Sequence, residues 1–176
     1  IMNSQILSKI NDFVKNRLIE FTGILLLLVA IFLSVSLASY PPSDPNFIYN
    51  TESIEIKNLA GFYGSVISDF LLQSIGIVSF FFILTLLSWG FELISNKKIT
   101  NFIAKAFYIQ FYIILGTTFI NIEFNDSFWL IDNGNSGFIG RIVKENFYTF
   151  TTLIENQYIV FLLFLLALMF FILSLN

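Results

Sequence analysis

The sequence lacks both cysteine and histidine. Without these residues the chain has no disulfide, no thiolate nucleophile, no Cys/His zinc site, no histidine haem ligand and no imidazole base for chemistry near neutral pH. Charged residues are scarce as well, at 12% of the 176 residues, whereas an ordinary soluble domain has roughly 25%. These shortages exclude many familiar classes of enzyme and argue against a soluble globular domain.

Basic residues are also few. Nine Lys and Arg against twelve Asp and Glu give a net charge of −3, and the sequence contains no basic stripe of the kind that neutralises nucleic-acid phosphates. We therefore expect no direct contact between this chain and nucleic acid.

Apolar residues make up most of what is present. The hydrophobic fraction is 56% and the mean hydropathy is +0.81, so the solvent around most of the chain must be lipid. About 20 apolar residues suffice to cross a bilayer core, and the uncharged residues gather in four runs of about that length. The sequence predicts an all-α, polytopic membrane protein with four transmembrane helices and short interfacial amphipathic helices. We expect the spans at about 21–38, 66–91, 102–120 and 157–175.

Residues 1–20, which precede the first span, have a helical pattern of their own. Ile6, Ile10 and Phe13 recur at helical spacing, and Lys9 lies on the other side. Two interpretations of this amphipathic lead-in stay open. One is a helix in the headgroup layer with its lysines toward anionic lipid, and the other is a solvated helical lead-in.

The distribution of Lys and Arg predicts the orientation in the membrane. Positive residues gather on the cytoplasmic side, and six of the nine lie before the first span or between the second and third. Both termini are therefore expected in the cytoplasm, with outer loops at 39–57 and 121–156. Lys105 is expected to reach its ammonium group to the headgroups. The six are Lys9, Lys15, Arg17, Lys97, Lys98 and Lys105, and the other three are Lys57, Arg141 and Lys144.

The outer loop 39–57 holds all three prolines of the protein. Proline fixes its own φ and pushes the preceding residue out of the α region. We therefore expect the segment 40–45 to leave the membrane surface as an extended or turned segment.

The second span is expected to begin well outside the bilayer, at Lys57 or Asn58, and to run unbroken toward Trp89. Small residues recur along it at multiples of four, a spacing that lets another helix approach closely. Asp69 is expected at the interface, among water and headgroups. The candidate helix-packing residues are Ala60, Gly64, Ser68 and Gly76.

The outer loop 121–156 contains a turn region and an amphipathic segment. Glycine and asparagine in 132–137 predict turns, and 138–150 is predicted to form an amphipathic helix on or partly within the outer leaflet. The glycines in 134–140 are no dinucleotide-binding fingerprint, because no strand precedes them. The candidate residues of this interfacial helix are Phe138, Ile142, Val143 and Phe147.

Several of these features together resemble a known family. The string Ser39-Tyr40-Pro41-Pro42-Ser43-Asp44-Pro45 directly after a first span, with the glycines and polar residues that follow it, is similar to the amino-terminal four-helix membrane domain of the FtsK/SpoIIIE DNA translocases. The Ser-Tyr-x-x-x-Asp-Pro part is the specific signal. The resemblance covers essentially the whole chain, although Ser65 and Ser68 stand where the family commonly has alanine. The residues that follow the string are Asn58, Gly61, Gly64, Asp69, Gly76, Gly134, Gly137 and Gly140.

The resemblance implies an anchor in the bacterial inner membrane at the division septum, joined to a hexameric ATP-driven motor that moves chromosomal DNA. No G-x-x-x-x-G-K-[ST] motif occurs, so nothing here is expected to hold ATP phosphates. We expect no enzymatic activity, no catalytic or metal-binding residue and no cofactor. The resemblance implies a homo-oligomer that forms through this motor, and the sequence leaves open whether the native protein continues past Asn176 into the motor.

Under this hypothesis the chain anchors and assembles, with the lipid bilayer and other division proteins as its partners. The alternative is a small four-helix transporter or channel subunit, which usually needs an ionisable or strongly polar residue inside a span. Here Asp69 and Glu92 lie only at span ends. A stand-alone structural membrane protein is a further possibility. The candidate residues for periplasmic partner contact are Ser39, Tyr40, Asp44, Pro45 and Phe47.

Overall fold

The computed structural model describes residues 2–46, 55–127, 129–130, 132–146 and 156–176. Two candidate residues, Phe47 and Phe147, lie outside this part. Within it the regular secondary structure is helical, without strands, and four helices are long and apolar enough to cross a membrane. The predicted all-α, polytopic membrane fold is confirmed. The helices are α1 (Met2–Ala38), α2 (Gly61–Ile75), the 3-10 turn η1 (Gly76–Val78), α3 (Ser79–Asn96), α4 (Phe102–Glu123), α5 (Gly137–Asn146) and α7 (Gln157–Leu175).

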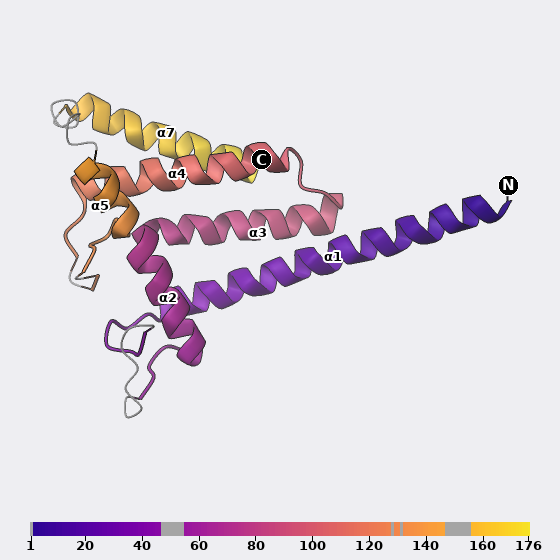
Figure 1. The fold of residues 1–176 in the computed structure, drawn as a ribbon, viewed down its shortest axis with the longest axis horizontal. Helices are drawn as coiled ribbons and strands as arrows, with labels where there is room; N and C mark the ends of the chain where they lie inside the picture. The colour runs from indigo at the N-terminus through magenta and orange to yellow at the C-terminus, as the bar shows by residue number, and fades with distance from the viewer. Residues whose placement is uncertain (1, 47–54, 128, 131, 147–155) are drawn as a thin grey trace.

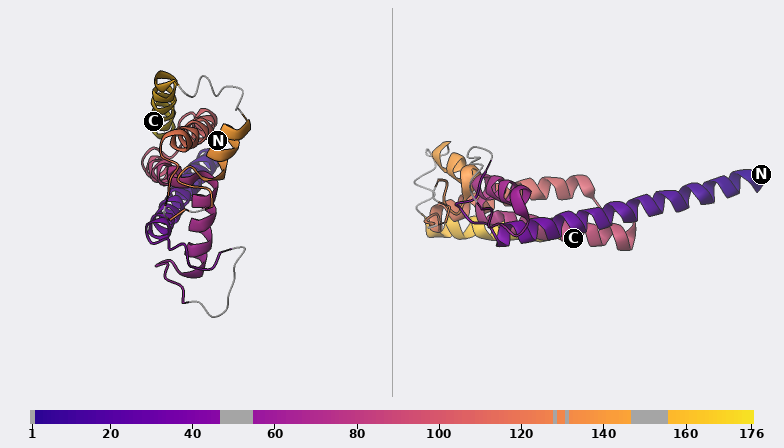
Figure 2. Two further views of the ribbon diagram at one scale, coloured as in Figure 1. Left: turned by 90° about the vertical axis from the view of Figure 1, so that its left-hand side faces the viewer. Right: turned by 90° about the horizontal axis from the view of Figure 1, so that it is seen from below.

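The helices form a bundle with two different ends (Figure 1). α1 packs mainly on α3, and α7 mainly on α4, while α3 and α4 run in opposite directions. At the loop end, α1 terminates and α2 and α5 lie across the bundle. At the hairpin end, the turn 97–101 joins α3 to α4, and the carboxyl end of α7 points the same way (Figure 2).

The predicted lead-in and the first span form one uninterrupted helix, α1. Its 37 residues, at about 1.5 Å each, give a length of roughly 55 Å, well beyond the roughly 30 Å of a hydrocarbon core. The amino-terminal part projects past the hairpin end (Figure 1). Where it meets the bundle, Glu20 pairs with both Arg17 and Lys97, each at 2.5 Å. The lead-in therefore continues along the axis of the span.

The second span is not the unbroken helix that the sequence predicted. α2 begins at Gly61, not at Lys57 or Asn58, and η1 separates it from α3. The physical reason for the break is Gly76, whose φ of +58° lies outside the helical region. The N–H of Ile77 donates to the carbonyl of Asn135 at 2.9 Å and not to its own helix. α2 consequently leans away from the axis of α3 (Figure 1).

The turn after the third span fills this break. A Cβ on Gly76 would lie 1.9 Å from the Asn135 carbonyl oxygen, and one on Gly137 would lie 2.6 Å from the Gly76 nitrogen. The Asn135 side chain donates to the carbonyls of Phe124 and Asp126 at 2.8 and 2.9 Å. The break in the second span and the end of α4 are thus joined through one asparagine, an arrangement that the sequence did not predict.

Apolar side chains form two clusters within the bundle. The first joins α1, α2 and α3, and the second joins η1, α4 and α7 around Val78, Tyr112 and Ile120. In α7 the buried residues are Val160 and Ser174, and its other apolar side chains are half-buried or exposed. An outward apolar surface is expected of a helix whose solvent is lipid. The buried members of the first cluster are Ala30, Leu33, Leu37, Leu72, Ile83 and Leu130.

We predict that Gly76→Ala destabilises the fold by more than about 3 kcal/mol, because backbone strain and the clash with Asn135 act together. Gly61→Ala is the matched control. Its φ is +70°, but no atom lies within 4 Å of the added Cβ, so it should lose only roughly 1–2 kcal/mol. Unfolding in mixed detergent micelles measures both variants. Equal losses would show that the Asn135 contact contributes nothing.

Candidate functional site

At the loop end, the proline-containing string is held in place by Asp44, whose side chain is buried. Its carboxylate accepts the N–H of Lys57, at 3.1 and 2.9 Å to its two oxygens, and the N–H of Asn58 at 2.8 Å. Hydrogen bonds from backbone N–H groups to an ionised carboxylate are among the stronger ones. Asp44 therefore closes the outer loop onto the segment that precedes α2.

Asn58 connects this loop to two helices. Its amide nitrogen donates to the carbonyl of Ser36 in α1 at 2.9 Å and to the hydroxyl of Ser68 in α2 at 3.4 Å. Its amide oxygen accepts the N–H of Ala60 at 2.9 Å. The predicted start of the helix at Asn58 is therefore wrong, because Ala60 is the N-cap of α2 and Asn58 instead turns the chain before α2.

The four candidate helix-packing residues do not share one helix face. A Cβ on Gly64 would lie 3.0 Å from the Ser36 hydroxyl of α1, and Ser68 is fully buried. Ala60 precedes α2, and Gly76 lies at the break facing Asn135. The structure thus brings Gly64 close to α1 with Ala60 beside it, bonds Ser68 to Asn58, and places Gly76 at the break.

Tyr40 is fixed from two sides. Its hydroxyl donates to the Asp69 carboxylate at 2.7 Å, and its ring meets that of Trp129 edge-on, with centroids 6.1 Å apart. Burial, together with the hydrogen bond to Asp69, raises the pKa of the Tyr40 phenol above its ordinary value. The raised pKa keeps the Tyr40 phenol protonated, and so able to donate to Asp69, up to a higher pH than an exposed tyrosine.

Ser39 and Pro45 are also bonded internally. The Ser39 hydroxyl accepts the N–H of Leu59 at 3.1 Å, and the Pro45 carbonyl accepts the hydroxyl of Ser65 at 2.9 Å. Four of the five candidate partner-contact residues thus use polar groups in hydrogen bonds within the molecule. The fifth, Phe47, lies outside the described residues. The exposed part of the string is the pair between them, Pro42 and Ser43.

The candidate interfacial helix corresponds to α5. Phe138 and Ile142 are exposed and Val143 is half-buried. The helix approaches α4 closely through Gly140, where a Cβ would lie 2.5 Å from the Thr117 carbonyl oxygen. Phe147 lies outside the described residues. An exposed apolar side on a short helix at the end of a membrane bundle suits contact with lipid or with another protein.

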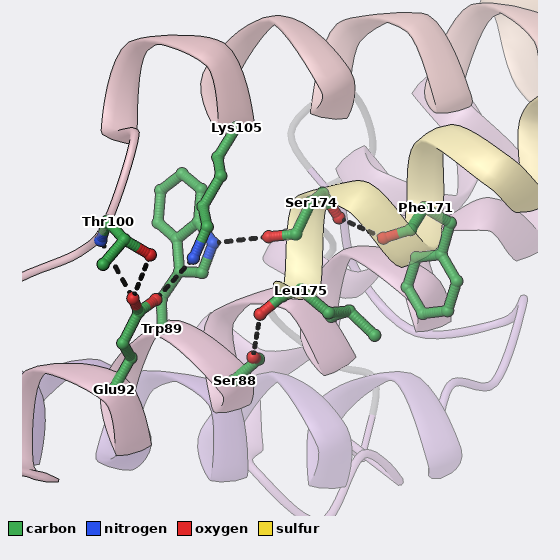
Figure 3. Close-up of polar contacts among 8 residues, drawn as sticks. All are labelled: Ser88, Trp89, Glu92, Thr100, Lys105, Phe171, Ser174 and Leu175. Atoms are coloured by element: carbon green, nitrogen blue, oxygen red, sulfur yellow. Dashed lines mark hydrogen bonds and ion pairs between the residues drawn. The ribbon is translucent and has the colours of Figure 1, made fainter. Parts of the chain in front are cut away.

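At the hairpin end, α3 and α4 are joined by an ion pair (Figure 3). The Lys105 ammonium lies 2.5 Å from the Glu92 carboxylate, and the Lys105 side chain is only 2% exposed. The other Glu92 oxygen accepts the N–H and the hydroxyl of Thr100 at 2.9 and 2.7 Å. The sequence predicted that Lys105 reaches out to the headgroups. This prediction is wrong, because Glu92 provides a partner inside the bundle.

The same end of α3 holds the carboxyl end of α7 (Figure 3). The Trp89 indole donates to the Ser174 carbonyl at 2.9 Å, and the Ser88 hydroxyl donates to the Leu175 carbonyl at 3.0 Å. The last carbonyls of a helix lack partners within it. In lipid such groups must be satisfied by protein, so these two donors fix where α7 lies. Sequence reasoning missed this contact, although a tryptophan and a serine side by side near a span end were a possible signal.

The described residues contain no group of three or more His, Cys, Asp or Glu that could hold a metal ion. The polar side chains at both ends of the bundle are bonded chiefly to each other and to backbone groups. These hydrogen bonds and ion pairs hold the helices at fixed positions.

Comparison with known proteins identifies the family. Residues 15–175 match a family model described as the 4TM region of DNA translocase FtsK/SpoIIIE. The chain belongs to this family. The resemblance suggested by the sequence is confirmed, and the chain corresponds to the membrane region of the translocase and not to its motor.

Two curated relatives of this FtsK/SpoIIIE membrane region are named DNA translocase FtsK. The protein of Azospirillum brasilense is 33% identical over 90 residues, which are 51% of this chain and 14% of the relative. That of Mesorhizobium japonicum is 22% identical over 136 residues, 77% of this chain and 15% of the relative. The matches therefore cover about a seventh of each relative's length. No solved structure matches the chain.

In this FtsK/SpoIIIE membrane region, the Ser-Tyr-x-x-x-Asp-Pro string builds the loop end from within. Ser39 bonds to the segment before α2, Tyr40 to α2 itself, and Asp44 to the segment before α2. Internal bonds thus account for the serine, the tyrosine and the aspartate of the string. Contact of these residues with a partner protein stays a prediction.

We predict that removing one partner of the buried pair is worse than removing both. Lys105→Met and Glu92→Leu should each lose roughly 3–5 kcal/mol, because each leaves a charge unpaired, and the double variant should lose less than the sum. Unfolding in mixed micelles measures this cycle. Arg141→Met, which removes an exposed pair with Glu145 at 4.0 Å, is the control and should change stability far less. Additive losses for Lys105 and Glu92 would contradict their coupling.

Proposed function

We propose that this chain is the membrane-anchoring and assembly domain of a bacterial cell-division DNA translocase, placed in the inner membrane at the division septum. The observation that carries the proposal is the family match over nearly the whole four-span bundle. Because the chain covers only 14% and 15% of the two curated relatives, the DNA motor that it tethers would belong to sequence that this chain does not include, and the chain itself would have no enzymatic activity.

The basic residues near the hairpin end support a cytoplasmic position for that end. Six of the nine basic residues belong to the lead-in or to the region around the turn 97–101, as expected on the cytoplasmic side. A tether must also resist being drawn along its own axis. The bonds from Ser88 and Trp89 to the last carbonyls of α7, and the ion pair between Glu92 and Lys105, oppose sliding of α7 and α4 past α3.

The loop end would then face the periplasm and contact other division proteins. Two surfaces there suit such contacts: the exposed tip Pro42 and Ser43, which Asp44 holds in position, and the exposed Phe138 and Ile142 of α5. A surface that is already ordered before binding loses less conformational entropy when a partner docks.

The alternative, a transporter or channel subunit, has weaker support from the geometry. Glu92 is bonded to Lys105 and Thr100, and Asp69 is bonded to Tyr40, so these groups hold helices together. Ion flux in liposomes that disappeared with Asp69→Asn would favour the alternative over the anchor.

The absence of cysteine allows the orientation to be tested with single-cysteine variants. We predict that Asp126→Cys, exposed at the loop end, reacts with a membrane-impermeant maleimide in intact spheroplasts. Lys98→Cys, exposed at the hairpin end, should react only after lysis. The reverse pattern would overturn the proposed orientation. Labelling of both positions in intact spheroplasts would show that the chain does not adopt a single orientation.

Septal placement is tested with a fluorescently tagged chain in dividing bacteria, where we predict a band at the septum. Ser43→Arg alters the exposed tip without touching its internal bonds, and should lower the septal fraction while the membrane level stays unchanged. Leu59→Arg, at a side chain that is 82% exposed elsewhere at the loop end, is the matched control because it adds the same charge. An even membrane signal for the unchanged chain would overturn the septal anchor, and an unaffected band for Ser43→Arg would remove the tip as a contact surface.

A further inference from the structure

An apolar groove of about 240 Å³ runs between η1, α3, α4 and α7. Phe164 and Leu168 on its rim are 39% and 38% exposed, so the groove reaches the outward surface of the bundle. Gly116 lies on its α4 side, where the lack of a side chain leaves space. Its lining includes Val78, Phe81, Gly116, Phe119, Phe164 and Leu168.

The size and position of the groove restrict what can occupy it. It is smaller than the roughly 300–1,000 Å³ of typical small-molecule sites and too small for a helix about 10–12 Å across. Along α4 it extends from Tyr112 to Phe124, roughly 18 Å at 1.5 Å per residue. A long, narrow, apolar space between membrane spans fits one acyl chain, which is also the solvent at that depth.

A polar hollow of about 520 Å³ adjoins the groove at the loop end, and Phe124 lines both. Glu123, Asp126 and Lys144 contribute charges of both signs to the hollow, and none of the three forms an ion pair with another described residue. A phosphate beside the lysine and an ammonium beside the carboxylates would complement these charges. The apolar groove matches the acyl chain of a zwitterionic phospholipid, and the charged hollow matches its headgroup.

We propose that the groove and the hollow together bind one phospholipid of the leaflet at the loop end. One acyl chain lies in the groove, and a headgroup with a phosphate and a primary ammonium, as in phosphatidylethanolamine, lies in the hollow. The proposal requires only that the bundle spans a membrane, and it holds whether or not the chain is a septal anchor. The bound lipid would fill the seam between α3, α4 and α7.

The test uses the full chain in vesicles of phosphatidylethanolamine and phosphatidylglycerol that contain a phosphatidylethanolamine probe with a photoreactive diazirine in one acyl chain. Labelling should concentrate on 112–124 and 164–171. Gly116→Leu fills the groove and should lower this labelling about tenfold, as other changes to an apolar pocket do. Ile114→Phe, on a lipid-exposed side of α4 away from the groove, is the matched control and should leave it unchanged.

Gly116→Ala guards against misfolding of the larger variant, because its Cβ would make an ordinary 3.5 Å contact with Val78; it should give a smaller decrease in the same direction. Lys144→Gln should reduce labelling by about threefold, but should not affect a diacylglycerol probe that has no phosphate.

Three results would overturn the proposal. Even labelling of all outward-facing helices that Gly116→Leu leaves unchanged would mean that only bulk lipid is present. A crosslink between two chains at the groove would identify a second copy as the occupant. Stronger competition by phosphatidylglycerol than by phosphatidylethanolamine would refute the assigned headgroup.

Discussion

The structure depends on one constraint: within lipid, each backbone N–H and C=O must find its partner in the protein. A continuous helix meets this constraint by itself, but a break or an end does not. At the break in the second span, the Asn135 carbonyl receives the N–H of Ile77. At the end of α7, Trp89 and Ser88 donate to the carbonyls of Ser174 and Leu175. Groups distant in the sequence thus complete the helices where local bonding stops.

The two ends of the bundle meet the constraint with different chemistry. At the loop end, the Asp44 carboxylate accepts backbone N–H groups of a segment without regular structure, and the Asn58 amide donates to the Ser36 carbonyl of α1. At the hairpin end, Glu92 satisfies the tight turn through Thr100 and pairs with Lys105. A buried ion pair adds little net stability but strongly disfavours arrangements that separate its members. It therefore selects the relative position of α3 and α4 more than it strengthens their contact.

The spans could be predicted because the signal for them is local: long runs of uncharged residues and a cluster of prolines. The contacts that position the helices are not local. Asn133 bonds to Gln73 across 60 residues, and Lys105 to Glu92 across 13. Considered alone, a lysine at a span end is expected to reach the headgroups, and only the fold brings a carboxylate close enough to hold it inside. Gly76 was recognised as a small residue, but its φ and its partner Asn135 depend on topology.

Two serines of α2 take part in the bonding of the loop end. Ser65 and Ser68 are both buried. Ser65 donates to the Pro45 carbonyl, while Ser68 donates to the Ser65 carbonyl and accepts from Asn58. Alanine at these positions would remove the side-chain oxygens from the inner side of the loop. Ser65 thus bonds the proline string to α2 directly, and Ser68 bonds to Asn58, whose N–H the Asp44 carboxylate accepts. The orientation of the exposed tip is therefore set by α2 and not by the loop alone.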